Sequence, residues 1–166
     1  QGPDVFFQGA EAANKYHARM PEILEKASEV VAGITGRKYA PYAYEGHPEA
    51  ENVVVIMGSG AVTVSEVVHK MLEEGKKVGV LKVRQFRPWT AEKFAAALPA
   101  TVKRIAVLDR LKENGAMGEP LFVDVCATLN QTGNSDIMVV GGRFGIGGKD
   151  FTPGQVLAVF DNLAAP

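Results

Sequence analysis

The sequence predicts an α/β fold of three layers (α/β/α), with helices on both faces of a mainly parallel sheet. From residue 52 onward, short apolar runs alternate with stretches of helical periodicity. The first run, Val53–Met57, is apolar at every position, which is typical of a parallel strand covered on both faces. Because crossovers of helix length separate the runs, we expect right-handed βαβ units.

The first 50 residues do not show this alternation. They are predicted to form an N-terminal arm, helices and a connector that lead into an α/β domain of residues 51–166. Residues 1–9 contain several helix breakers and no periodicity, so an extended arm is expected there. Residues 10–19 have helical composition, and Pro21 suits the first turn of a second, longer helix.

That longer helix is expected to carry one apolar face and to end at a glycine. Gly36 is the candidate C-terminal cap, because glycine readily adopts the left-handed conformation that ends helices. The tyrosines and prolines of residues 37–48 indicate a connector or a short edge strand. The apolar face is formed by Ala27, Val30, Val31 and Ile34.

Four strands and four helices are expected in the α/β domain. The strands are predicted at residues 53–57, 78–83, 105–108 and 137–140. Thr90 is expected to cap the second helix, which runs to Ala97, and Thr152 the fourth. The apolar faces are Val64, Val67, Val68, Met71 and Leu72 in the first helix, Phe122, Val125, Cys126 and Leu129 in the third, and Val156, Leu157 and Phe160 in the fourth.

Cys126 is the only cysteine of the chain. It shares an apolar helix face, so we expect a buried, structural thiol rather than a nucleophile. A single thiol can form neither an intrachain disulfide nor a cysteine cluster, which suits a reducing cytoplasm.

The charge balance argues against nucleic acid and membranes as partners. Eighteen basic and nineteen acidic side chains give a formal net charge of −1, so no global basic field exists. No apolar run reaches membrane-spanning length, and no signal peptide is evident, so a soluble, cytoplasmic protein is expected. Because the chain does not begin with methionine, we expect a piece of a larger polypeptide.

A glycine turn follows the first strand of the α/β domain and could bind an anion. The turn, residues 58–60, is followed by a predicted helix. The first N–H groups of a helix can bind a phosphate or a carboxylate. Ser59 and Gly60 are therefore weak anion-site candidates. The simpler interpretation is that Ser59 only caps the helix. Thr63 stands where a dinucleotide fingerprint requires its third glycine.

Two further groups of residues are predicted to face a neighbouring domain. Arg84, Arg87 and Trp89 follow the second strand, where arginines could grip an anion or, in our preferred interpretation, bind a partner surface. Asp109, Arg110 and Lys112 follow the third strand. They form no catalytic constellation, because no nucleophile accompanies them. We expect Asp109 to hydrogen-bond to backbone.

No metal site and no catalytic residue are predicted. His17, His47 and His69 lie far apart in the sequence, without the spacing of zinc ligands, and His69 is expected on an exposed helix side. The glycines from Gly141 to Gly148 indicate a flexible loop. Arg143 and Lys149, at either end of that loop, are expected to contact a partner domain.

The sequence resembles the second domain of the pyruvate:ferredoxin (or flavodoxin) oxidoreductases over nearly its whole length. Leu111 and Asn114 stand where a threonine and a proline are more usual in that family. The segments that carry the resemblance, in order, are Pro3–Gly9, Glu11–Asn14, Thr35–Tyr39, Met57–Ser59, Leu81–Arg84, Phe86–Pro88, Val107–Val125, Gly142–Gly145 and Lys149–Pro153.

The resemblance implies a fold similar to the C-terminal domain of transketolase and a larger, homodimeric parent enzyme. That parent would decarboxylate pyruvate on thiamine diphosphate and magnesium. It would pass electrons through [4Fe-4S] clusters to ferredoxin or flavodoxin, and the acetyl unit to coenzyme A. This chain lacks a thiamine motif and the Cys-x-x-Cys-x-x-Cys spacing of a cluster, so we expect it to bind none of these cofactors.

The chain is therefore expected to be a scaffold that orients the thiamine-binding domains of the parent and contributes to its dimer. Two alternatives stay open. One is a free-standing α/β module that binds a small ligand or a nucleotide at Ser59 and Gly60. The other is the equivalent domain of a different 2-oxoacid:ferredoxin oxidoreductase.

Overall fold

The computed structural model describes residues 2–165, and its contacts divide the chain into two compact units. One unit comprises Gln1–Pro41 and Gln85–Thr90, and the other comprises Tyr42–Arg84 and Ala91–Pro166. The domain boundary near residue 50 stays a prediction.

The first unit contains one long helix, α1, at Pro3–Thr35. The expected extended arm at residues 1–9 is wrong, because residues 3–9 are helical. Pro3 occupies the first helical turn and Asp4 follows it, and both residues favour a helix start there. Pro21 lies inside this helix rather than at the start of a second one. At the other end Gly36 adopts φ 71° and donates its N–H to the Ala32 carbonyl, as expected of a helix cap.

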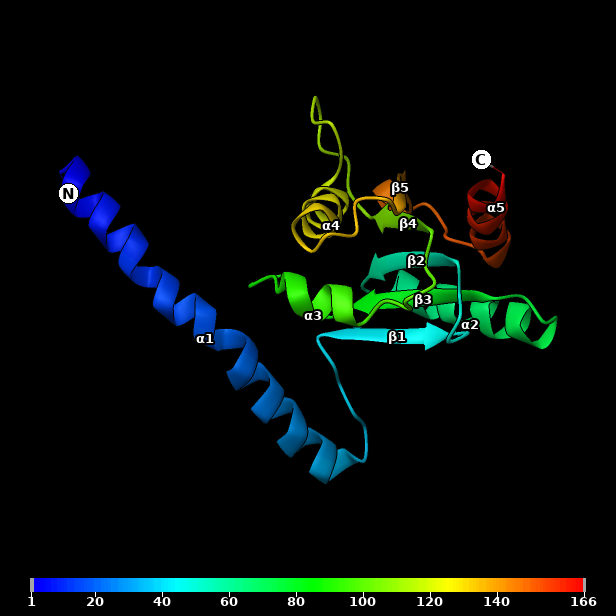
Figure 1. Cartoon of the computed structure of the whole chain (residues 1–166), viewed down its shortest axis with the longest axis horizontal. Helices are drawn as coiled ribbons and strands as arrows, with labels where there is room; N and C mark the ends of the chain where they lie inside the picture. The colour runs from blue at the N-terminus through cyan, green and yellow to red at the C-terminus, as the bar shows by residue number, and fades with distance from the viewer. Residues whose placement is uncertain (1, 166) are drawn as a thin grey trace. The chain divides into compact units, whose positions relative to one another are not determined.

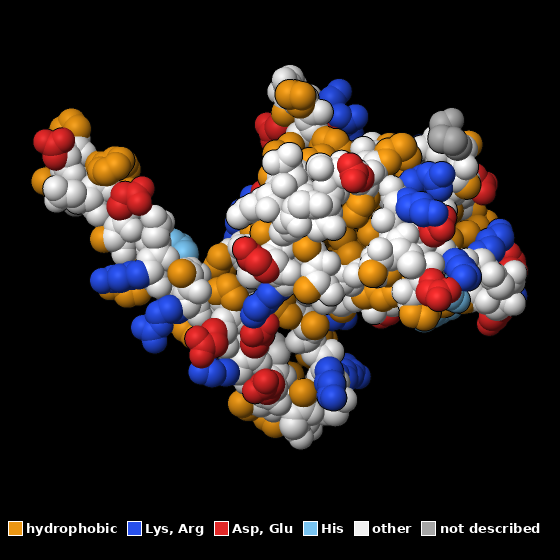
Figure 2. Space-filling model, viewed as in Figure 1, with side chains coloured by type: hydrophobic (Ala, Val, Ile, Leu, Met, Phe, Trp, Pro, Cys, Tyr) orange, Lys and Arg blue, Asp and Glu red, His pale blue; other side chains and the backbone are white. Residues whose placement is uncertain are grey.

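Helix α1 buries none of its side chains. The face that was expected to be apolar is present, but Val30 is 64% exposed and Ile34 is 80% exposed. In Figure 2 hydrophobic side chains reach the surface along this helix. Periodicity predicted the helical segment after Pro21 correctly, whereas burial of its face needs a partner surface.

The second unit is built on a five-stranded sheet of order β1-β3-β2-β4-β5 (Figure 1). β1 pairs with β3 in antiparallel fashion, and the other pairs are parallel, so the predicted mainly parallel α/β sheet is confirmed. The strands are β1 Tyr42–Gly46, β2 Asn52–Met57, β3 Val78–Val83, β4 Arg104–Asp109 and β5 Met138–Arg143.

Helices cover both faces of this sheet. α2 and α5 pack together on one face, and α3 and α4 pack together on the other. The chain passes from β2 to β3 on one side and then to β4 on the other, so the strand order reverses between β2 and β4. The helices are α2 Gly60–Glu73, α3 Ala91–Ala96, α4 Pro120–Gln131 and α5 Pro153–Ala164, and a 3₁₀ turn, η1, spans Ile146–Gly148.

The fourth predicted strand is longer than expected. β5 continues to Arg143 in register with β4, so Gly141 and Gly142 are strand residues and not part of a flexible loop. Glycine suits position 142 because a Cβ there would lie 2.8 Å from the Leu108 side chain.

The core is formed by the central strands and one face of each covering helix. α5 buries Val156, Phe160 and Leu163 at spacings of four and three residues, which leaves Leu157, expected to be buried, 42% exposed beside that stripe. Cys126 is likewise only half-buried, because α4 turns Val125 and Leu129 most directly to the sheet. Burial raises the pKa of Cys126 nonetheless.

Candidate functional site

The loops that follow β2, β4 and β5 leave the same edge of the sheet, because these strands are parallel. Ligands of open α/β sheets usually bind at this edge, where the strand order reverses. The candidate site is therefore described loop by loop.

Asp109, the last residue of β4, is 1% exposed and fixes the start of α4. Its two carboxylate oxygens accept hydrogen bonds from the backbone N–H groups of Leu121 and Phe122, both at 3.2 Å. Burial raises the pKa of Asp109, and these two bonds offset part of the rise. The carboxylate thus satisfies N–H donors that a helix start leaves free, as we expected of a residue bonded to backbone.

Glu119 immediately precedes α4, and the sequence analysis did not single it out. Its side chain is 5% exposed and accepts a hydrogen bond from Nε of Arg143 at 2.6 Å, while Arg143 is 46% exposed. The bond from Arg143 holds the pKa of Glu119 below its ordinary value. The sequence did contain a signal for Glu119, an acidic residue directly before the proline that starts a helix. Its partner Arg143 could not be predicted from that signal, because it lies 24 residues away.

The loop between β4 and α4 is anchored at its base and exposed beyond it. Nε of Arg110 donates to the Gly145 carbonyl at 3.1 Å, which ties this loop to the one after β5. Lys112 and the residues around it are exposed. In the part of the chain that the structure describes, Lys112 has no ion pair or hydrogen bond.

Ser59 and Gly60 lie at the start of α2, as the sequence predicted. Ser59 is the N-cap residue of α2, as expected, but its side chain makes no capping hydrogen bond within the described residues. Gly60 lies against the ring of Phe144, and a Cβ at this position would be 2.6 Å from that ring. The N–H of Ala61 already donates to the Gly58 carbonyl at 3.2 Å.

Arg84 directly follows β3 and belongs to the second compact unit. Arg87 and Trp89 belong to the first compact unit. The guanidinium of Arg87 stacks 4.0 Å from the centroid of the Phe86 ring, and that ring meets Trp89 edge to face at 6.4 Å. Gln85 donates its side-chain amide to the Pro88 carbonyl at 2.7 Å. These contacts form a local aromatic and cationic cluster.

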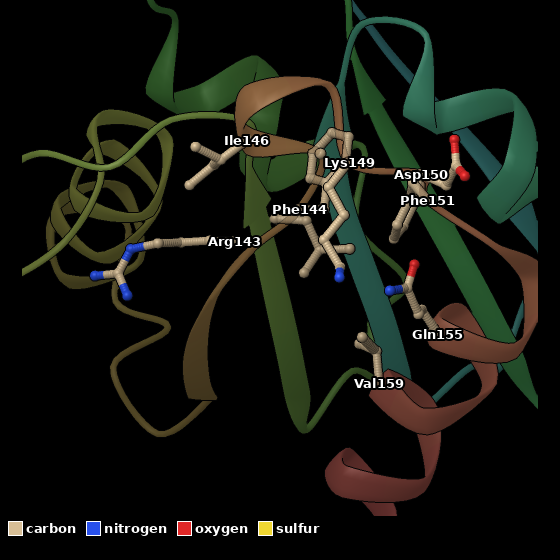
Figure 3. Close-up of a pocket in the computed structure, with 10 residues that line it drawn as sticks. Arg143, Phe144, Ile146, Lys149, Asp150, Phe151, Gln155 and Val159 are labelled. Carbon is tan, nitrogen blue, oxygen red and sulfur yellow. The ribbon is translucent and has the colours of Figure 1, made fainter.

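A cavity of about 340 Å³ opens beside the loop after β5 (Figure 3). Leu108, Phe144 and Val159 give it apolar walls, and Lys149 and Gln155 supply polar groups. The Phe144 and Phe151 rings pack at 4.6 Å between centroids. Binding pockets for small molecules have volumes of roughly 300–1,000 Å³, so this cavity lies at the lower end of that range.

A second polar cluster lies on the same face of the sheet but at its opposite edge, between β1, β3 and α2, and was not foreseen. Glu45 forms an ion pair with Lys82 and accepts a hydrogen bond from Ser65 at 2.8 Å. His69 lies 4.0 Å from Glu45 and is 58% exposed, in agreement with the sequence. Burial raises the pKa of Glu45, but the bonds from Lys82 and Ser65 and the charges of Lys82 and His69 outweigh it, so that its pKa is lowered.

The described residues offer no metal-binding constellation. Among residues 2–165, no group of three or more His, Cys, Asp or Glu side chains could hold a metal ion. Within the same residues, no helix combines the length and the apolarity that a membrane span requires.

Comparison with known proteins identifies relatives that are much longer than this chain. The family model described as "Pyruvate:ferredoxin oxidoreductase core domain II" matches residues 50–156. The chain is 54% identical over 165 residues to a pyruvate:ferredoxin oxidoreductase of Moorella thermoacetica, and 50% identical to a pyruvate-flavodoxin oxidoreductase of Rhodospirillum rubrum. In both cases 99% of this chain is covered, but it spans only 14% of the relative.

A mitochondrial pyruvate dehydrogenase [NADP(+)] of Euglena gracilis is 48% identical over 99% of this chain, which spans 9% of that protein. Among solved structures, a 2-oxoglutarate:ferredoxin oxidoreductase from Magnetococcus marinus, with 2-oxoglutarate, coenzyme A and succinyl-CoA bound, matches with a TM-score of 0.55. At 21% identity, over 75% of this chain and 20% of that one, this match supports the fold alone.

Proposed function

The chain belongs to the family of pyruvate:ferredoxin oxidoreductase core domain II, and on that premise we propose that it is a non-catalytic scaffold of such an enzyme. The observation that carries the proposal is the identity of 54% over 99% of the chain to a protein of which it spans 14%. The remaining domains of the same polypeptide are its partners in this proposal.

The parent enzyme would oxidise pyruvate. Pyruvate would lose CO₂ and two electrons, its acetyl group would be transferred to the sulfur of coenzyme A with release of the thiol proton, and the electrons would pass to ferredoxin or flavodoxin. Thiamine diphosphate, magnesium and [4Fe-4S] clusters would supply this chemistry in a homodimeric, cytoplasmic enzyme. The residues of this chain do not fit a [4Fe-4S] cluster, since Cys126 is the only thiol and a cluster needs four ligands. Among residues 2–165, no group of three or more His, Cys, Asp or Glu side chains could hold a metal ion. No step of the reaction is therefore assigned to this chain.

The scaffold role draws support from how the strand-end residues are used. Asp109 bonds to the start of α4, Arg110 to the Gly145 carbonyl, and Glu119 to Arg143, so these charged groups hold this unit's own loops. Lys112 is exposed and, among the described residues, makes no ion pair or hydrogen bond, which leaves it open to a neighbouring domain. Arg84, Arg87 and Trp89 are proposed to contact a neighbouring domain because arginine and tryptophan are enriched at interfaces. Ser59 and Gly60 offer less support for a free-standing ligand-binding module, because the Phe144 ring covers Gly60.

The test uses the intact parent enzyme. Trp89→Ala is expected to weaken the assembly of its domains or of its dimer, measured by analytical ultracentrifugation and thermal unfolding, and to leave its thiamine content unchanged. Lys77→Ala, at an exposed ion pair with Glu49, is the matched control and should change neither. Normal assembly combined with a selective loss of the keto-acid or coenzyme A step would contradict the scaffold proposal.

The equivalent domain of another 2-oxoacid:ferredoxin oxidoreductase is the second candidate. Measured rates of the intact enzyme with pyruvate and with 2-oxoglutarate distinguish a pyruvate oxidoreductase from another 2-oxoacid:ferredoxin oxidoreductase. We expect pyruvate to be preferred, because the two most similar relatives named above are pyruvate enzymes.

A further inference from the structure

Strand β5 is an edge of the five-stranded sheet, and no strand of residues 2–165 pairs with its outer side. The N–H of Met138, its first residue, donates to the Lys103 carbonyl at 2.9 Å, toward β4. Successive residues of a strand direct their N–H and C=O groups to opposite sides, so Val139, Gly141 and Arg143 direct theirs outward. The edge therefore presents three donors and three acceptors at the spacing that an added strand requires.

The two edges of the sheet are protected differently. Natural sheets guard their edges with charged side chains, prolines, bulges or very short strands. At the opposite edge, β1 is five residues long, directly follows Pro41 and carries the charged Glu45. None of these devices occurs in β5 before Arg143, and Arg143 is bonded to Glu119 of the same unit. The edge at β5 is thus open to a further strand, whereas the edge at β1 is guarded.

The faces of β5 are also incompletely covered. Parallel strands are normally buried on both faces, as the four central residues of β2 are here. In β5, by contrast, Val139 and Val140 are only half-buried. A hollow of about 280 Å³ lies beside the strand on the α5 face, lined by Val140, Gly142 and Ala158 among others. A neighbour that pairs with the edge would also close this hollow.

From this edge we propose that β5 of a second copy of the chain pairs with it in antiparallel fashion, about a two-fold axis at Gly141. Two identical strands related by a two-fold axis can pair only in this direction, and the same surface then serves both copies. Gly141 lies opposite the partner's Gly141, and the outward N–H and C=O groups of both strands are satisfied. The contact belongs to this chain alone and is independent of the proposed scaffold role.

The sequence of β5 is complementary to itself in this register, which is why a second copy fits the edge. On the α5 face, Val140 lies opposite the partner's Gly142, so a valine meets the hollow beside a glycine, and the contact repeats across the axis. On the α4 face, Val139 lies opposite the partner's Arg143. The two arginines are four residues apart along the strands, about 14 Å at 3.4 Å per residue, so like charges do not meet.

The test combines analytical ultracentrifugation of the whole chain with amide hydrogen exchange. A contact made by one strand pair and its flanks is small, so a dimer with a Kd of roughly 10 μM is expected. The amides of Val139, Gly141 and Arg143 should exchange roughly tenfold more slowly at about 1 mM chain than at about 1 μM, where the monomer prevails. The amides of Val140 and Gly142, which already face β4, are the internal control and should not respond.

A matched pair of variants tests the register. Val139→Lys places a second positive charge opposite the partner's Arg143, twice in each dimer, and should weaken association. Val139→Glu is the control, because it removes the same valine and adds a charge of the opposite sign at the same position. The Lys variant should dissociate at least about tenfold more readily than the Glu variant, since opposite charges across a strand pair attract and like charges repel. Urea unfolding verifies that both variants fold.

Several outcomes would overturn the proposal. Equal association of the two variants would place the contact elsewhere, for instance on the exposed face of α1. A chain that stays monomeric at about 1 mM, or exchange at Gly141 that does not depend on concentration, would show that a second copy does not add to β5. Each of these results leaves the scaffold proposal standing, because that proposal is tested through Trp89 in the intact enzyme.

Discussion

The starts of α2 and α5, which follow β2 and β5, differ in the space they leave open. At α2, Gly60 lies under the Phe144 ring, with 2.6 Å between that ring and the position of a Cβ. At α5, the nearest atom to the Cβ position of Gly154 is 4.0 Å away, and the cavity lined by Lys149 lies alongside. The usual ligand position of an open α/β sheet is thus occupied by a side chain of this chain, and its open surface lies beside α5.

The largest expected effect comes from removing the ring that covers the start of α2. Phe144 is 8% exposed and belongs to the core between α2, α5 and the sheet. Phe144→Ala should lower the free energy of unfolding by about 3–5 kcal/mol, the usual cost of deleting a buried phenylalanine. Urea unfolding measures this change. Ile146→Ala, two residues away and 46% exposed, should cost less than about 1 kcal/mol, and equal losses would show that the ring is not packed as described.

The two glycines allow a matched comparison. Gly60→Ala should cost about 1–3 kcal/mol, because the added methyl overlaps the Phe144 ring. Gly154→Ala meets no close atom and should be neutral or stabilising by up to about 1 kcal/mol. Thermal unfolding of both variants provides the measurement. A stabilised Gly60→Ala variant would mean that the start of α2 is open.

Asp109 should make stability depend on pH, in the opposite direction from most carboxylates. Its pKa is raised on folding, so the unfolded chain loses the proton first. The contribution of Asp109 to the free energy of unfolding therefore falls as pH rises from its ordinary pKa, about 3.9, to its raised value, and is constant above that. Asp109→Asn should remove this fall. It should also cost about 1–2 kcal/mol at neutral pH, because one of two buried N–H donors loses its partner.

Glu45 should show the reverse pH dependence. Its pKa is lowered on folding, so its contribution is present above the ordinary glutamate pKa and is lost as pH falls through the lowered value. The Glu45 side chain is 35% exposed, which limits the effect of Glu45→Gln to about 1 kcal/mol or less. The free energy of unfolding of the unchanged chain and of the Glu45→Gln variant should be measured as the pH is lowered. If the two pH profiles are parallel, the described ion pair of Glu45 with Lys82 is contradicted.

The smallest expected effect comes from Lys149, which lines the cavity beside the loop after β5. Lys149→Ala should change the free energy of unfolding by no more than about 0.5 kcal/mol, since the ammonium has no partner among the described residues. A larger loss in urea unfolding would show that Lys149 holds the loop after β5.

The sequence predicted most of the α/β unit because its signals are local. The apolar run of β2 and the Thr152 cap of α5 are both readable within a few residues, and both are confirmed. The single helix at residues 3–35 was missed because proline and glycine, which usually break helices, lie inside it.

The site was less predictable because its contacts join distant segments. Glu119 meets Arg143 and Arg110 meets Gly145 only once β4 and β5 are paired. The pair of Glu45 and Lys82 likewise depends on the antiparallel register of β1 and β3, which no local pattern specifies. The contact of the Phe144 ring with Gly60 was also not predictable from a local pattern, since the two residues lie far apart in the sequence.

The most direct test of the central claim, that the strand-end edge of this unit is no cofactor site, is a calorimetric titration of the chain with thiamine diphosphate and magnesium. The scaffold account predicts no saturable binding. One-to-one binding tighter than about 100 μM, well within the range of ordinary protein–ligand affinities, would contradict it.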